Sequence, residues 1–168
     1  MKESGKILTD KDSAALMAAI SSTGVFVTCG LDTPNIMVTH WGEIGKMWGR
    51  QVFSLPIRST KYSYKIVKET KSFALNIPAP TRDMRTEISL CDTISGFKVN
   101  KFETLNLHPK RARSIDAYVL GECGLIVEYK VIAIIPPESI QKEVPDLFGS
   151  PRPHTIFVGE VVDSYKLR

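Results

Sequence analysis

Hydrophobic positions in this chain are grouped into short runs rich in Val, Ile, Phe and Leu, and clusters of Gly, Pro and polar residues separate these runs. Runs of this length between turn residues are typical of β-strands. We therefore expect strands at residues 25–29, 35–41, 51–56, 72–77, 121–135 and 154–162. The middle of residues 125–135 also alternates polar and apolar side chains, as strands do.

Helix signals are fewer. We expect helices at residues 12–20, where capping residues precede an Ala-rich apolar stripe, at 61–70, where Tyr62, Ile66 and Val67 have helical spacing, and at 81–90, which starts with a Thr cap. Residues 42–49 fit neither pattern and are expected to form a loop. Residues 94–103 read as a polar loop leading into a helical turn, and the Pro- and Gly-rich residues 136–153 as a long excursion.

Helices inserted singly among about six strands predict a mainly β fold, an antiparallel barrel, and not a doubly wound sheet. No Gly-rich dinucleotide fingerprint follows any expected strand, which disfavours a Rossmann fold. The length of 168 residues predicts a single domain over 1–168, large enough for a core but small enough that a large ligand needs a second subunit to be enclosed.

The net charge of +4 is modest, and its tightest cluster is Lys110, Arg111 and Arg113, which we interpret as a solvated loop or strand edge. We therefore expect no nucleic-acid partner. No apolar run is long enough to cross a bilayer, and residues 1–10 lack the apolar core of a signal peptide. These observations predict a cytoplasmic protein without membrane contact.

The three cysteines, Cys29, Cys91 and Cys123, are odd in number and widely spaced, and no Cys or His spacing suits a metal. We expect reduced thiols that act as small buried hydrophobes. Cys91 has polar neighbours in sequence, which leaves open that it is reactive.

A candidate anion site lies where the strand at 51–56 runs into the helix at 61–70. Ser59 or Thr60 is a good N-cap, and Arg58 and Lys61 flank this helix start. Free N–H groups at a helix start and a bidentate guanidinium suit a phosphate. The alternative is an ordinary capped helix, although a basic first turn opposes the helix dipole unless an anion offsets it.

Five blocks of sequence carry a family resemblance. They are Pro34-Asn35-Ile36-Met37 with Trp41, Ile57-Arg58-Ser59-Thr60-Lys61-Tyr62-Ser63-Tyr64, Phe73-Ala74-Leu75-Asn76-Ile77-Pro78, Ser95-Gly96 with Lys101-Phe102, and His154-Thr155-Ile156-Phe157-Val158-Gly159-Glu160-Val161. With these blocks in order, the chain resembles the flavin reductase-like, FMN-binding split-barrel proteins, close to the flavoredoxin group. The resemblance implies a split antiparallel β-barrel with FMN held non-covalently at a homodimer interface.

The resemblance also implies roles for particular residues. The FMN phosphate would contact Arg58, Ser59, Thr60 and Lys61; the isoalloxazine edge would contact Asn35, Thr39, His40 and Trp41; the ring or ribityl chain would contact Asn76, Ser95, Gly96 and Lys101; and Lys98 or Lys101, with His154, would tune the redox potential. The implied function is that of an FMN-dependent oxidoreductase, an NAD(P)H:flavin or NAD(P)H:acceptor reductase, which takes electrons from a reduced nicotinamide or a protein donor. Catalysis would come from the cofactor, with no catalytic side chain and no metal.

Simpler roles remain open for the same residues. His40 and His154 could be surface or core-edge histidines, Trp41 could fill core, and Lys98 and Lys101 could be solvated loop residues. The protein could also be an FMN carrier without turnover, or a barrel that binds another ligand such as haem.

Three departures from the family pattern concern the site. Asp92 follows Cys91 where the family often has Gly, and Phe97 follows Gly96 where a basic residue is usual. In addition, Pro151-Arg152-Pro153 precedes His154 in place of the more usual Gly-Asp.

Overall fold

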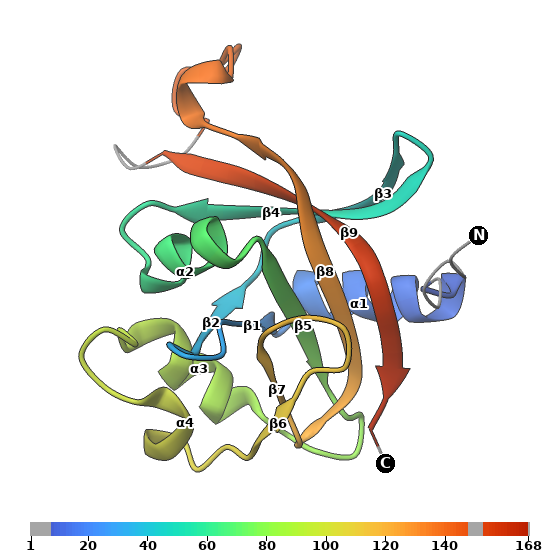
Figure 1. Ribbon diagram of the computed structural model, residues 1–168, viewed down its shortest axis with the longest axis vertical. Coiled ribbons are helices and arrows are strands. Elements are labelled where there is room, and N and C mark those ends of the chain that lie inside the picture. Colours follow the sequence, from blue (N-terminus) through green and yellow to red (C-terminus); the bar gives the residue numbers. More distant parts are fainter. Residues whose placement is uncertain (1–7, 148–152, 168) are drawn as a thin grey trace.

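The computed structural model describes residues 8–147 and 153–167 (Figure 1). Its strands are β1 (Val25–Cys29), β2 (Asn35–Thr39), β3 (Glu43–Met47), β4 (Arg50–Arg58), β5 (Ser72–Pro78), β6 (Pro109–Arg111), β7 (Tyr118–Leu120), β8 (Cys123–Ile135) and β9 (His154–Lys166). Its helices are α1 (Asp10–Ser21), α2 (Tyr62–Thr70), α3 (Arg85–Thr93), α4 (Lys101–Thr104) and the 3-10 turn η1 (Pro137–Ser139). The predicted mainly β fold with inserted helices is confirmed.

Seven strands form one antiparallel sheet in the order β2-β1-β5-β8-β9-β4-β3. Strands β2 and β3 follow each other in the chain yet lie at opposite edges of this sheet, so the sheet curls until its two edges approach. Gly42, in the short crossing between them, lies so close to Phe53 of β4 that a Cβ atom would stand 2.2 Å from the ring. The result is the split antiparallel barrel, and we call the opening between the ends of β2 and β4 its seam.

Both faces of the curled sheet are buried over its central strands. Alternate residues of β1 point to opposite sides, so that Val25 and Val27 join one core with α1 and α2, whereas Phe26 joins the other. The second core packs under α3, α4 and the small β6-β7 sheet. Burial on both faces explains why β1 and β2 read as continuous apolar runs in the sequence.

Several boundaries differ from the prediction. Residues 43–47, expected to be a loop, form β3, which pairs with β4 through a hairpin at Trp48 and Gly49. Their side chains are mostly exposed, and this is why no apolar pattern marked the strand. The helix expected at 81–90 begins four residues later, at Arg85, with Met84 as its N-cap. Strand β2 ends at Thr39, before Trp41.

Other expectations are confirmed. Residues 61–70 form α2 except for Lys61, which is its N-cap, and residues 101–104 form the expected helical turn. Cys29, Cys91 and Cys123 are buried and unpaired by disulfides. Residues 109–111 form an exposed strand edge. Two stretches with sequence-based expectations lie outside the described residues. They are residues 1–7 of the polar lead and residues 148–152 of the Pro- and Gly-rich segment, which include Pro151 and Arg152.

The described residues contain neither a membrane-spanning helix nor a cluster of metal-ligating side chains. No helix there has the length and apolar character to span a bilayer. No group of three or more His, Cys, Asp or Glu side chains in the same part of the chain could hold a metal ion.

Candidate functional site

Two adjoining cavities open along the seam of the barrel. The larger, which we call the seam cavity, has a volume of about 460 Å³ and is bordered by the ends of β2 and β4 and the start of β9. The smaller, the side cavity, has about 140 Å³ and lies between β2, α2 and the loop after α3. Met37, Lys61 and Asp92 line both cavities. A volume of several hundred Å³ is typical of a cofactor site.

Most of the predicted site residues meet here. The seam cavity is lined by Thr39, His40, Trp41, Arg58, Lys61 and His154. The side cavity is lined by Asn35, Thr60, Lys61, Ser95, Gly96 and Lys101. In the seam cavity, the end of β2 and the residues after it supply Thr39, His40 and Trp41, whereas Arg58 ends β4, His154 starts β9 and Lys61 is the N-cap of α2.

Arg58 and His154 face each other because β4 and β9 pair with these two residues in register. The Arg58 Nε donates to His154 Nε2 at 3.3 Å. Burial lowers the pKa of His154, and the positive charge of Arg58 lowers it further. His154 is therefore neutral at pH 7, consistent with its Nε2 accepting a hydrogen bond. The Trp41 ring lies 5.1 Å from the imidazole, between centroids.

Thr39 shapes the turn that presents Trp41. Its hydroxyl donates to the Trp41 carbonyl at 2.7 Å and accepts from the Trp41 N–H at 3.2 Å. The Trp41 side chain is 54% exposed. The tip of β2 thus holds an accessible indole at the cavity rim, and not in the core.

The start of α2 has no side-chain cap. Lys61 is the N-cap residue and its side chain makes no capping hydrogen bond, so the predicted capping role of Ser59 or Thr60 is wrong. Both of these residues are exposed in the turn between β4 and α2. The first turn of α2 contains no acidic residue, and its N–H groups start beside Arg58 and Lys61.

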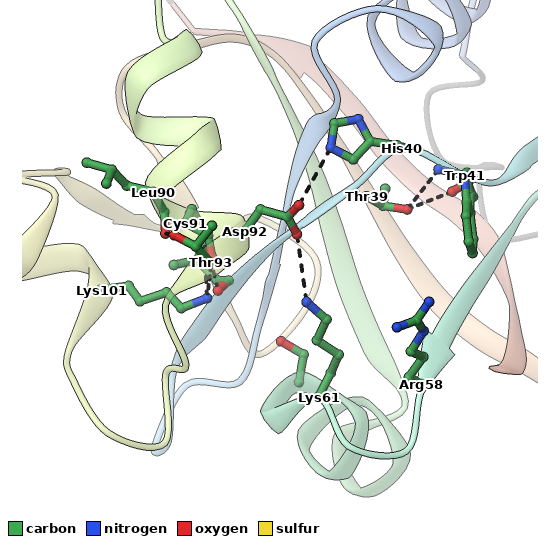
Figure 2. A network of polar contacts seen from close by, with 12 residues as sticks. Thr39, His40, Trp41, Arg58, Lys61, Leu90, Cys91, Asp92, Thr93 and Lys101 are labelled. Atoms are coloured by element: carbon green, nitrogen blue, oxygen red, sulfur yellow. Dashed lines mark hydrogen bonds and ion pairs between the residues drawn. The ribbon is translucent and has the colours of Figure 1, made fainter. Parts of the chain in front are cut away.

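Asp92, in the last turn of α3, faces this cationic end (Figure 2). Its Oδ1 lies 3.7 Å from Lys61 Nζ, and its Oδ2 lies 3.9 Å from His40 Nε2. The sequence prediction did not include Asp92 among the site residues. The departure from the family's usual Gly at this position was the available signal.

The side cavity is organised around Asn35. Its amide donates to the buried Ser63 hydroxyl at 2.8 Å, which ties β2 to α2. Gly96 packs on the same amide. Ser63 and Tyr62, which also line this cavity, were missed as site residues.

Lys101 is buried, with 5% of its surface exposed. Its ammonium donates to the Cys91 carbonyl oxygen at 2.7 Å and lies 3.9 Å from Cys91 Sγ (Figure 2). Burial lowers the pKa of Lys101. The interpretation of Lys101 as a solvated loop residue is therefore wrong.

Three of the described residues predicted for the site, Ser59, Asn76 and Lys98, line neither cavity. Asn76 is fully buried, where it donates to Thr28 Oγ1 and accepts from the Leu120 N–H, so its amide holds β5 to its neighbours. Lys98 is an exposed residue of the turn after Ser95.

Comparison with solved structures shows the same fold. Flavoredoxin of Desulfovibrio vulgaris (Miyazaki F) superposes with a TM-score of 0.69 at 24% identity, covering 85% of this chain and 68% of that one. An FMN-binding protein from Thermus thermophilus gives 0.65 at 13% identity, covering 84% and 68%. The NADH:FAD oxidoreductase of Streptomyces globisporus gives 0.65 at 16%, covering 96% and 87%.

A sequence model of the family described as the flavin reductase like domain matches residues 17–166. The match includes every strand of the seven-stranded sheet and both cavities of the seam. The chain therefore belongs to the flavin reductase like domain family, and its function is that of a flavin-related oxidoreductase.

Proposed function

We propose that the chain is an FMN-dependent oxidoreductase, folded as one domain over 1–168, and that the seam cavity holds the FMN. The observation that carries this proposal is an apolar-walled cavity that ends on two cations beside an uncapped helix start. A flat aromatic ring with a phosphate tail needs this combination of apolar walls and an anion-binding end.

The cationic end suits the phosphate. Arg58 can donate to two phosphate oxygens at once, and Lys61 adds a second charge. The first turn of α2 supplies oriented N–H groups and partial positive charge without a side chain competing for them. Thr60 lines the adjoining side cavity and adds a hydroxyl, whereas Ser59 lines neither cavity.

The walls suit the ring. Met37, Val38, Pro56 and Ile57 give the seam cavity apolar surface, and Trp41 stands at its rim. Thr39 and His40 place polar groups at the same strand end, so that an isoalloxazine edge would find hydrogen-bond partners there. When bound, FMN supplies the redox chemistry by accepting a hydride or electrons and passing them on.

Of the residues predicted to tune the cofactor's potential, His154 lines the seam cavity and Lys101 lines the side cavity. The buried Lys101 ammonium borders the side cavity and would stabilise negative charge on a reduced ring. His154, held neutral by burial and by Arg58, adds no charge of its own near pH 7. Lys98, exposed on its turn, is not part of this proposal.

The proposed electron donor is a reduced nicotinamide or a protein, and the acceptor is unidentified. The name of the Streptomyces relative, an NADH:FAD oxidoreductase, supports the nicotinamide donor. We also propose that the protein is a homodimer and that it is cytoplasmic. Exposed Trp41 and Phe97 beside the cavities, 54% and 77% exposed, support a second subunit covering the open side.

The test starts with an absorbance spectrum of the purified protein, followed by anaerobic addition of NADH or NADPH. Flavin bands that bleach with either nucleotide support the reductase. Bound FMN without nicotinamide oxidation would identify a carrier instead, and a Soret band would identify a haem protein. Sedimentation velocity measures the oligomeric state.

A second test concerns the phosphate contact. Arg58→Ala should weaken FMN binding at least tenfold and riboflavin binding less than twofold, because only FMN carries the phosphate. Arg50→Ala is the matched control, since Arg50 lies at the other end of β4 and pairs with Glu160. Equal losses of FMN and riboflavin affinity would refute the phosphate role.

A further inference from the structure

Asp92 places a negative charge in the seam cavity, beside the cations Arg58 and Lys61. Its carboxylate lines both the seam cavity and the side cavity and lies between Lys61 and His40. The other ionisable side chains that line the seam cavity are Arg58 and His154. Asp92 is thus the one acidic side chain among the described residues that line either cavity.

Local stability does not explain this carboxylate. Asp92 lies in the last turn of α3, where the helix dipole disfavours negative charge. Its two ion pairs are long, and the three side chains are between 41% and 45% exposed. Ion pairs of this kind contribute little to stability because water screens them.

We infer that Asp92 is a specificity-determining residue that weakens the binding of the phosphate end and makes FMN an exchangeable ligand. This inference rests on the proposed function of the seam cavity. A phosphate oxygen that accepts from Lys61 lies about 2.8 Å from Nζ. The phosphate is then within about 7 Å of the Asp92 carboxylate, which already lies 3.7 Å from the same Nζ.

Two effects follow from this geometry. The carboxylate repels a phosphate dianion, and it also competes with the phosphate for the Lys61 ammonium. Both effects act on FMN but not on riboflavin, which lacks the phosphate. Asp92 therefore lowers the preference for FMN over riboflavin, and it speeds FMN release because affinity changes within one site fall mostly on the dissociation rate.

The experiment compares Asp92→Asn with the wild-type protein, using FMN and riboflavin in parallel fluorescence titrations at low salt. The amide keeps the shape and can still accept a hydrogen bond from Lys61, but it removes the charge. We expect the FMN dissociation constant to fall about tenfold, which corresponds to about 1.4 kcal/mol, and the riboflavin constant to change less than twofold. Stopped-flow displacement should show slower FMN release.

Asp116→Asn is the matched control. Asp116 is an exposed carboxylate paired with Arg111 at 2.8 Å, so this variant makes the same change in net charge away from both cavities. It should leave both dissociation constants unchanged.

The outcomes separate two failures. If wild-type protein binds neither FMN nor riboflavin, the proposed function itself is wrong. If it binds FMN and Asp92→Asn leaves the FMN-to-riboflavin preference unchanged, only the role of Asp92 is wrong. An equal gain of FMN affinity in Asp116→Asn would also overturn the role, because net charge and not position would then be the cause.

Discussion

Gly96 packs directly against the side chain of Asn35, so closely that a Cβ atom at position 96 would stand 1.8 Å from Asn35 Oδ1. The Asn35 amide in turn donates to Ser63. The contact therefore joins the loop after α3 to the start of β2 and, through Ser63, to the first turn of α2. All three residues line the side cavity.

Gly96→Ala should displace the Asn35 amide and break its hydrogen bond to Ser63. We expect a loss of about 1–3 kcal/mol in the free energy of unfolding, from overpacking and the lost bond. FMN affinity should fall several-fold with it, because the wall of the side cavity moves. Urea unfolding and FMN titration measure the two effects.

Gly45→Ala is the control for this substitution. Gly45 lies in the exposed strand β3, and a Cβ atom there meets nothing within 4 Å. It should leave stability and FMN affinity nearly unchanged. If Gly96→Ala were equally silent, the close contact with Asn35 would have no energetic importance.

His154 should titrate below its ordinary pKa of 6.5, because burial and then Arg58 lower it. Arg58→Ala should raise the pKa of His154 but leave it below 6.5, since burial is the larger cause. Titration of the imidazole signals by NMR measures both values. A pKa of His154 that returned fully to 6.5 in Arg58→Ala would show that burial has no part.

The same shift sets the sign of a pH effect on stability. Between the lowered pKa of folded His154 and 6.5, the unfolded chain binds more protons than the folded one. The free energy of unfolding should therefore decrease as the pH falls from 6.5 through the folded pKa. The decrease in the free energy of unfolding over this pH range should be absent in His154→Gln. It should remain in His40→Gln, because that substitution changes an exposed residue and leaves His154 in place.

Glu128 is fully buried and accepts three hydrogen bonds, from the N–H groups of Arg113 and Ser114 and from the Tyr165 hydroxyl. Glu128→Gln should cost about 2–3 kcal/mol, because the new amide N–H₂ group faces a donor in place of an acceptor. Tyr165→Phe should cost about 1.5 kcal/mol, since it removes one bond only. Glu138→Gln, at an exposed position, should cost almost nothing. Chemical denaturation measures the free energy of unfolding of the three variants. If Glu128→Gln had no effect on it, the hydrogen bonds of Glu128 would not contribute to stability.

Cys91 should be unreactive in the folded protein, although Lys101 lies close to its sulfur. Burial raises the pKa of Cys91 to about 11 and that of Cys29 to about 12. A thiol reagent at pH 8 should therefore label none of the three cysteines until the protein is unfolded, when all three react. Rapid labelling lost in Cys91→Ser would instead identify Cys91 as a reactive thiol.

Apolar runs in the sequence predicted the central strands closely. These strands are buried on one or both faces, so most of their residues are apolar. Strand β3 was missed because its outward side chains face water and carry no apolar signal. The shift of α3 has a similar origin, since Thr81 is a good cap by type but Met84 occupies the N-cap position.

Local pattern and family resemblance predicted most of the residues that line the two cavities. Arg58 and Lys61 could be found because they lie beside a recognisable helix start. Asn76 was predicted to contact the ligand because its side chain is polar. In the structure, its amide instead forms hydrogen bonds with Thr28 of β1 and Leu120 of β7. The ion pairs of Asp92 could not be predicted, because they depend on how closely α3 approaches α2.

The crossing from Thr39 to Glu43 leads the chain from one margin of the sheet to the other, and Gly42 presses it onto Phe53. The number of residues in this crossing, more than their chemistry, limits how far apart the ends of β2 and β4 can lie. We expect that a few residues inserted between Thr39 and Gly42, with Gly42 kept against Phe53, would let the ends of β2 and β4 lie farther apart. Ligand size in this protein could thus be altered through the length of one connection, without changing any side chain that touches the ligand.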